Sequence, residues 1–174
     1  MAMPIPMSEF LSNHHVDYHI LKHKPTAIAA EAAQAAAIPL AELARSSIVE
    51  SINYPGQLLM VLLPASHLLD LNKLGQLTDE NFREIEPAQL KEIFQDATPC
   101  GIPGLGQPFN LDMVVDQRLF RVPRVYLEDG DNTELVKLSQ QQFAQLLGGL
   151  LSGDISRPPP SPTRTAMRWS TQLT

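Results

Sequence analysis

Two apolar segments joined by a short turn indicate a β-hairpin near the middle of the chain. Residues 46–52 and 57–63 flank Asn53-Tyr54-Pro55-Gly56, whose asparagine, proline and glycine are typical of a tight turn. The second segment is apolar without interruption from residue 58 to residue 63, which is typical of a strand buried on both faces. We therefore expect a hairpin whose second strand lies in the centre of a sheet.

Further strands and helices alternate along the chain without a regular repeat. Apolar periodicity predicts strands at 16–22, 113–115, 125–128 and 134–138, with a weaker one at 82–86. Helices are expected at 9–14, 27–37, 68–74 and 87–94, the second of them capped by Thr26. A capping box of Ser139 and Gln142 begins a last helix, which ends at Gly148-Gly149. This order predicts an α/β protein with a mixed sheet.

The composition is that of a single folded domain. The chain has 174 residues, of which 44% are hydrophobic and 18% charged, which argues against wholesale disorder and against a coiled coil. No apolar stretch approaches the roughly 18 residues of a membrane span, and the first ten residues lack the pattern of an export signal. A single cysteine, Cys100, excludes an internal disulfide and a multi-cysteine zinc site. We expect a cytoplasmic protein with no membrane partner.

The net charge limits the ways in which this chain can bind nucleic acid. The formal charge is −6, and three arginines follow the last acidic residue, Asp154, so the acidic character is concentrated in the body of the chain. An acidic body disfavours non-specific binding along a phosphate backbone, although a local cluster of basic groups can still hold a phosphate. We therefore expect no DNA partner, and any contact with RNA must be confined to a small site.

The composition changes near the C-terminus. From residue 152 onward serine, proline, threonine and arginine dominate, including Pro158-Pro159-Pro160. We therefore expect a domain at residues 1–151 followed by a flexible tail at 152–174 that does not belong to the core. Met167 and Trp169 are the sizeable apolar residues of this tail, and docking on a neighbour is the alternative to flexibility.

A proline- and glycine-rich segment at 96–110 predicts a long, fixed and exposed loop. Its centre, Gly101-Ile102-Pro103-Gly104-Leu105-Gly106, has neither the spacing of a dinucleotide-binding fingerprint nor the lysine of a P-loop. Such a loop can turn consecutive backbone N–H groups toward an oxyanion or a phosphate. A tight connection with no ligand is the alternative.

Histidines and the single cysteine are further candidates. His15, His19 and His23 recur every four residues and thus share one side of a strand or helix, but no other ligand stands at a spacing that completes a metal shell. We expect no metal site there. Cys100 lies beside the glycine loop, and a thiol-dependent hydrolase that uses His23 as its base remains an alternative.

Several motifs, taken in order, resemble the YbaK/EbsC/ProX family, which includes free-standing aminoacyl-tRNA deacylases and the editing insertion of bacterial prolyl-tRNA synthetase. The resemblance covers residues 16–147. The segments that carry it are His23-Lys24-Pro25-Thr26, the alanine-rich helix, Ala44-Arg45-Ser46-Ser47-Ile48-Val49-Glu50, residues 61–67 with Leu69-Asp70-Leu71, the loop at 101–106, Val115-Asp116, and Val125-Tyr126 with Gly130-Asp131.

The resemblance implies a curved mixed β-sheet flanked by helices, and hydrolysis of the ester at the 3′ end of a mischarged aminoacyl-tRNA. It further implies that a synthetase is a possible partner and that no cofactor or metal is needed. Arg45 stands where the family carries an important lysine and becomes the candidate catalytic residue. The substrate-binding residues implied by the resemblance are His23, Thr26, Gly101, Ile102, Pro103, Gly104, Gly106 and Asp116. Asp116 alone could equally serve as a structural cap.

Departures from the family pattern leave two functions open. Arginine keeps the positive charge of the family lysine, but it is larger, planar and unable to release a proton near neutral pH. Cys100, Gly104 and Asn132 also replace residues that are commonly glycine, proline and histidine in the family. We therefore expect either a trans-editing deacylase or a catalytically degenerate member that binds a ligand as a regulatory module.

Overall fold

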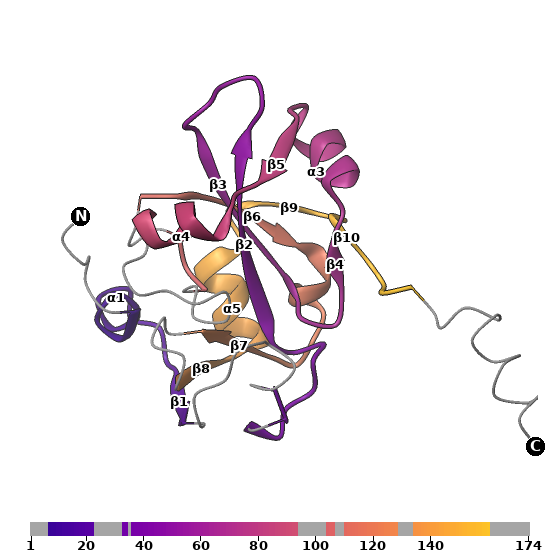
Figure 1. The fold of residues 1–174 in the computed structure, drawn as a ribbon. Coiled ribbons are helices and arrows are strands. Elements are labelled where there is room, and N and C mark those ends of the chain that lie inside the picture. Colours follow the sequence, from indigo (N-terminus) through magenta and orange to yellow (C-terminus); the bar gives the residue numbers. More distant parts are fainter. Residues whose placement is uncertain are drawn as a thin grey trace, which may run out of the picture.

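The computed structural model describes residues 7–22, 33–34, 36–93, 104–106, 110–128 and 134–160, which form three β-sheets and five short helices (Figure 1). The helices are α1 (Met7–Asn13), α3 (Leu71–Thr78), α4 (Pro87–Ile93), the 3-10 helix η2 (Gln117–Phe120) and α5 (Gln140–Leu147). The strands are β1 (His19–Lys22), β2 (Ala44–Ser51), β3 (Leu58–Pro64), β4 (Leu68–Leu69), β5 (Phe82–Glu84), β6 (Asp112–Asp116), β7 (Arg124–Glu128), β8 (Glu134–Ser139), β9 (Leu151–Gly153) and β10 (Ser156–Arg157).

The predicted hairpin forms the middle of a five-stranded mixed sheet with the order β5-β2-β3-β6-β9. Strands β2 and β3 pair antiparallel, and their connection turns at Gly56, whose φ of 91° is one that residues with a side chain rarely adopt. On the other side of β3, strand β6 pairs parallel, and β9 pairs parallel with β6. The uninterrupted apolar segment is therefore a central strand, as expected.

Each face of this sheet carries its own apolar core. Met60 and Leu62 of β3 belong to the larger cluster, with Met113 and Val115 of β6, whereas their neighbours on the opposite face belong to a second cluster. This division follows from the alternation of side chains along a strand. The second cluster is covered by α3 and by a residue of the C-terminal segment, and its members are Val49, Val61, Leu63, Leu74, Phe82, Val114 and Ile155.

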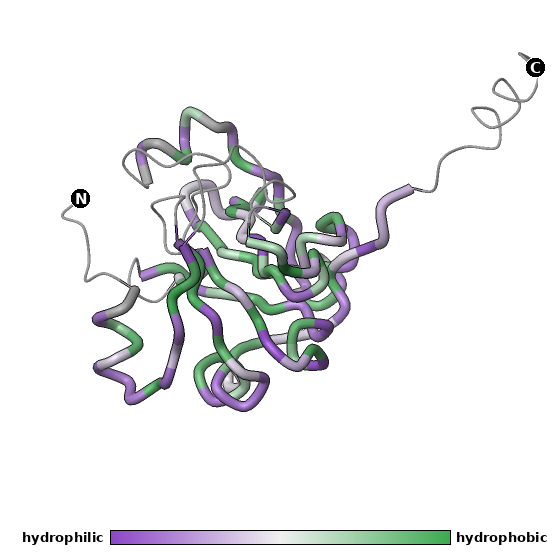
Figure 2. The backbone as a smooth tube through the Cα atoms, turned by 90° about the horizontal axis from the view of Figure 1, so that it is seen from below, coloured by the Kyte–Doolittle hydropathy of each residue, from purple (hydrophilic) through white to green (hydrophobic). Residues whose placement is uncertain are grey.

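A three-stranded antiparallel sheet with the order β1-β8-β7 packs against the larger cluster. It meets the five-stranded sheet where Leu43 bridges to Tyr126. Helix α5 contacts β7, β8 and η2, and Ser139 caps it by accepting a hydrogen bond from the Gln142 N–H at 3.1 Å. Figure 2 shows that hydrophobic and hydrophilic residues alternate along much of the described backbone. The mixed sheet flanked by helices agrees with the expected fold.

The expected boundary after residue 151 falls inside β9. Residues 151–153 pair with β6, and Ser156 and Arg157 of β10 pair with β4. Ile155 and Ser156 have no exposed surface. The core therefore extends at least to residue 157, and the part of the expected tail beyond residue 160 lies outside the described residues.

The helix expected at 68–74 is also shifted. Leu68 and Leu69 form β4, and helix α3 begins only after Asp70, whose carboxylate accepts hydrogen bonds from the N–H groups of Asn72 and Lys73. The partner of β4 lies more than eighty residues further along the chain, where local periodicity gives no signal of it. Within the described part of the chain, no helix combines the length and apolar character needed to cross a membrane.

Candidate functional site

Arg45 stands near the beginning of β2, two residues after Leu43, whose bridge to Tyr126 links the two sheets. It pairs with Leu63 of β3, so alternation places its side chain on the face that carries the second apolar cluster. Arg45 is half-buried, and its Nε atom is buried without a hydrogen-bond partner among the described residues. A buried donor without an acceptor is costly to a fold and calls for an explanation.

The charge of Arg45 persists despite its burial. Desolvation lowers the pKa of the guanidinium, and the negative charge of Glu84 on β5 opposes this effect. Arginine begins from so high a pKa that the group stays protonated at neutral pH. The side chain can therefore hold a phosphate or a developing oxyanion, but it cannot act as a general base.

The described part of the glycine loop lies on the other side of the sheet. Gly104 is so close to β7 that a Cβ at this position would stand 2.8 Å from the Cβ of Leu127, and a Cβ on Gly106 would stand 2.8 Å from the carbonyl oxygen of Leu111. Leu127 belongs to the larger cluster, and Leu111 packs against it. The described residues therefore do not bring Arg45 and these two glycines together on one face.

The N–H groups of the two glycines are already used inside the protein. The Gly104 N–H donates to the Glu128 carbonyl oxygen at 2.9 Å, and the Gly106 N–H donates to the sulfur of Met113 at 3.0 Å. Neither N–H is left to bind an oxyanion. This geometry accounts for glycine at both positions by the close approach of the loop to its neighbours.

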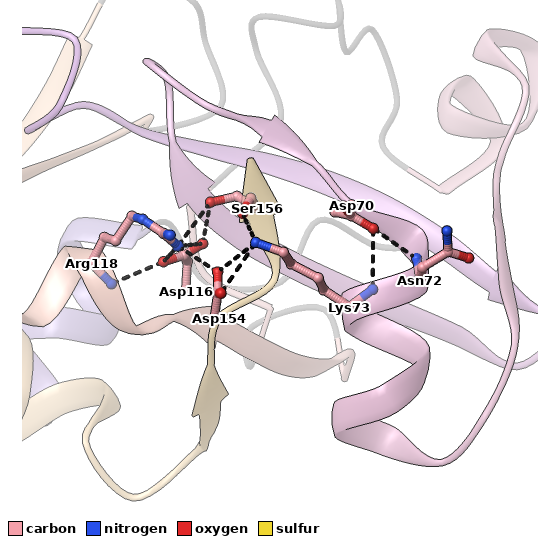
Figure 3. A network of polar contacts seen from close by, with 7 residues as sticks. All are labelled: Asp70, Asn72, Lys73, Asp116, Arg118, Asp154 and Ser156. Atoms are coloured by element: carbon pink, nitrogen blue, oxygen red, sulfur yellow. Dashed lines mark hydrogen bonds and ion pairs between the residues drawn. The ribbon is translucent and has the colours of Figure 1, made fainter. Parts of the chain in front are cut away.

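Asp116, at the end of β6, is part of a saturated polar network (Figure 3). Its carboxylate is fully buried, accepts a hydrogen bond from the Arg118 N–H at 2.9 Å as the N-cap of η2, and accepts another from the Ser156 hydroxyl. A guanidinium nitrogen of Arg118 contacts both oxygens of Asp116 at 3.3 Å and one oxygen of Asp154 at 2.8 Å. The structure thus gives Asp116 the role of a structural cap.

The network extends from Asp116 to helix α3. Lys73 donates from its Nζ to both oxygens of Asp154, at 3.1 and 3.3 Å, and to the carbonyl oxygen of Ser156 at 2.9 Å. These contacts join β6, η2, α3 and the C-terminal segment. Sequence reasoning missed this network because its members lie far apart in the chain. The Asp116-x-Arg118 spacing ahead of an apolar pair was the local signal of a capped turn.

Five of the expected binding residues, His23, Thr26, Gly101, Ile102 and Pro103, lie outside the described residues, as do Cys100 and Asn132. Among the residues that the structure describes, no three histidine, cysteine, aspartate or glutamate side chains gather where they could share a metal ion. One pocket lined by described residues lies beside β6 and β9 and is largely apolar, another lies beside β7 and β8, and neither includes Arg45.

The comparison with family models decides the relationship. Residues 23–146 match the aminoacyl-tRNA editing domain, which is more than half of the chain. The chain belongs to this family. The matched range contains every residue that the sequence predicted for the site, from His23 to Asp116.

Solved structures of similar fold extend the comparison. The hypothetical protein APE2540 is 24% identical, with a TM-score of 0.76 over 86% of this chain and 98% of that one. A candidate trans-editing enzyme for prolyl-tRNA synthetase is 22% identical, with a TM-score of 0.69 over 86% of this chain and 91% of that one. At these identities the likeness establishes the fold. A search of curated protein sequences gives no match.

Proposed function

We propose that this chain is a trans-editing aminoacyl-tRNA deacylase, which hydrolyses the ester of a mischarged tRNA. In this reaction the oxygen of a water molecule forms a bond to the ester carbonyl carbon, and the bond from that carbon to the ribose oxygen breaks. The products are the free amino acid and a tRNA with a free terminal hydroxyl. Membership of the editing-domain family supports this assignment.

The observation that carries the proposal is the buried Nε of Arg45, which has no acceptor among the described residues. A permanent cation with a free donor is suited to the negative charge that develops on the carbonyl oxygen during attack. Because the guanidinium stays protonated, the proton of the attacking water passes to the ribose oxygen or to solvent rather than to Arg45. Arg45 would thus replace the family lysine in an electrostatic role.

The remaining parts of the proposed site come from the glycine loop and from the segment after β1. Gly104 and Gly106 use their N–H groups internally and lie across the sheet from Arg45, so the proposed backbone contacts to the aminoacyl moiety are assigned to Gly101, Ile102 and Pro103. His23 and Thr26 are proposed to contact the terminal nucleotide. The proposed substrate is the 3′ end of the tRNA, the reaction needs no added cofactor, and the setting is the cytoplasm, where a synthetase can present the tRNA.

Single-turnover hydrolysis tests this function. Correctly and wrongly charged tRNAs are mixed with an excess of the native chain, of Arg45→Lys or of Arg45→Ala. The matched control is Arg121→Ala, because it removes an exposed arginine at the end of η2. We expect the native chain to hydrolyse one class of mischarged tRNA. Arg45→Ala should be slower by about 10²- to 10³-fold, the effect typical of losing an oxyanion donor. Arg45→Lys and Arg121→Ala should keep most of the rate.

The same experiment separates the deacylase from a ligand-binding module. If the native chain hydrolyses none of the esters while Arg45→Lys does, arginine at position 45 prevents hydrolysis. The chain would then be a module that binds its ligand without hydrolysing it. If Arg45→Ala keeps the native rate, the proposed electrostatic role of Arg45 is wrong.

A further inference from the structure

Among the described residues, one face of the three-stranded sheet is covered by apolar side chains at one end only. Cross-strand pairing places Leu21 beside Leu135, and with Tyr126 these residues are covered by the cluster that contains Ala33 and Leu43. Along the same face, the other end of the sheet carries His19, Lys137 and Arg124. Polar side chains thus continue the row where the apolar cover ends.

A pocket with a volume of about 390 Å³ opens over this polar end. Its size falls within the range of roughly 300–1,000 Å³ that is usual for ligand sites. The residues that line it include Asp17 and His19 before and on β1, Arg124 on β7, Lys137 on β8, and Ser139 with Gln142 at the start of α5. Asp17 is the one acidic side chain among the pocket's lining residues.

The basic groups of this pocket lie side by side. His19 stands directly opposite Lys137, and Tyr126 stands opposite Lys137 on the other side, with Arg124 two positions before Tyr126 on β7. Directly opposite side chains have Cβ atoms about 4.5–5.5 Å apart, and diagonal neighbours lie at roughly 7–8 Å, so the three basic residues can reach one ligand.

Hydrogen-bonding capacity in the pocket is left unused. Among the described residues, Lys137 and His19 make no side-chain hydrogen bond or ion pair, and Arg124 uses only its Nε, which contacts Glu42 at 3.2 Å. The side-chain oxygen of Gln142 is buried without a partner among the described residues, and a half-turn of its amide group would exchange that oxygen for a donor nitrogen. The start of α5 adds partial positive charge.

We propose that this pocket, here called the β1-β8-β7 pocket, binds a backbone phosphate of the tRNA, an inference that rests on the proposed function. The sheet itself connects the two sites. Strand β7 runs from Arg124 at the pocket to Glu128, whose carbonyl oxygen holds Gly104 of the glycine loop. Four residues of strand span about 13 Å, and Gly104 packs on Leu127, whose side chain lies on the face opposite to Arg124, so a tRNA that reaches both sites passes the edge of this sheet. The pocket also gives an acidic chain the small basic site that any RNA contact requires.

Salt dependence of tRNA binding tests the phosphate contact without any need for hydrolysis. The affinity of uncharged tRNA is measured by fluorescence anisotropy between about 50 and 200 mM salt for the native chain and for Lys137→Gln, Lys137→Arg and Arg157→Gln. Arg157 is the matched control, because it is an exposed basic residue of β10 outside the pocket. We expect Lys137→Gln to bind roughly three- to tenfold more weakly at low salt and to lose about 0.7–0.9 from the slope of log affinity against log salt. Lys137→Arg and Arg157→Gln should behave as the native chain does.

An unchanged slope in Lys137→Gln would overturn the proposal, whether or not the chain hydrolyses any ester. Inorganic phosphate, titrated while the His19 ring signals are followed by NMR, distinguishes the source of the anion. Saturable shifts with phosphate together with an unchanged tRNA slope would identify a small-anion site and would also overturn the RNA assignment. If the chain hydrolyses an aminoacyl-tRNA, Lys137→Gln should raise the protein concentration that gives half of the maximal rate and leave the maximal rate unchanged. Hydrolysis of an aminoacyl-adenosine, which lacks backbone phosphates, should not be affected by this substitution.

Discussion

Two arginines at different places in the molecule occupy opposite chemical situations. Arg118, beyond the end of β6, directs one guanidinium nitrogen to Asp116, Asp154 and Ser156, and its backbone N–H is also bound (Figure 3). Arg45, near the start of β2, has a buried Nε with no acceptor among the described residues. Hydrogen bonding and the Asp154 carboxylate raise the pKa of Arg118, whereas burial lowers that of Arg45.

This difference separates a group that holds the fold together from one that we propose to serve a ligand. A charged group whose donors are satisfied by neighbouring carboxylates stabilises the segments that carry them. A buried donor without an acceptor costs free energy, and natural proteins keep such groups mainly where a ligand or reaction uses them. The contrast can be tested by removing groups from each region and comparing stability with activity.

The largest effect on stability is expected from Asp116→Ala. The substitution leaves the Arg118 guanidinium, its N–H and the Ser156 hydroxyl without their shared acceptor, and breaking a buried pair in this way costs about 3 kcal/mol. Urea denaturation measures the loss. Asp112→Ala, at the exposed start of the same strand, is the matched control and should change the free energy of unfolding by less than about 0.5 kcal/mol. Equal effects of the two variants would show that the network does not stabilise the fold.

A smaller effect of opposite sign is expected at the other arginine. Arg45→Met keeps an apolar side chain of similar length and removes a buried charge, so the free energy of unfolding should rise by about 1 kcal/mol while hydrolysis is lost. Arg118→Met should lower the free energy of unfolding by about 2 kcal/mol, because the carboxylates of Asp116 and Asp154 lose the guanidinium that donates to them. Chemical denaturation of both variants measures the contrast. A loss of stability in Arg45→Met as large as in Arg118→Met would mean that Arg45 is also structural.

The sequence predicted the parts of the fold that depend on local patterns. The turn at Gly56, the central strand β3 and the Ser139 cap each follow from residues within a few positions of one another. The β4-β10 pairing could not be predicted, because a two-residue strand has no measurable period and its partner lies in a segment of polar composition. Within the described part of that segment, Ile155 is the apolar residue that joins the second cluster.

The sequence could predict which residues belong to the candidate site, but not which contacts these residues make. The sequence identified Arg45 and Asp116 as candidates. It could not show that the Asp116 carboxylate already accepts hydrogen bonds from Ser156 and Arg118, since these contacts depend on where the C-terminal segment folds back. It placed Gly104 in a binding loop, whereas the close approach to Leu127 explains that glycine structurally. Membership of a family assigns positions to a site, and only the packing shows which groups are still free to act.

The smallest expected effect is on how stability depends on pH, and it comes from Asp154 at the exposed edge of the polar network around Asp116. Hydrogen bonds from Arg118 and Lys73 lower the pKa of Asp154 below its ordinary value of roughly 3.9. A carboxylate whose pKa is lower in the folded state stabilises the fold above its unfolded pKa, and this contribution is lost as the pH falls through the folded value. Asp154→Asn should therefore be less stable than the native chain at neutral pH, and the gap should narrow as the pH falls below about 4. Thermal denaturation from pH 7 down to pH 3 measures this gap. A gap that stays constant over that range would show that the carboxylate charge of Asp154 contributes nothing, so that Arg118 owes its structural role to the buried Asp116 alone.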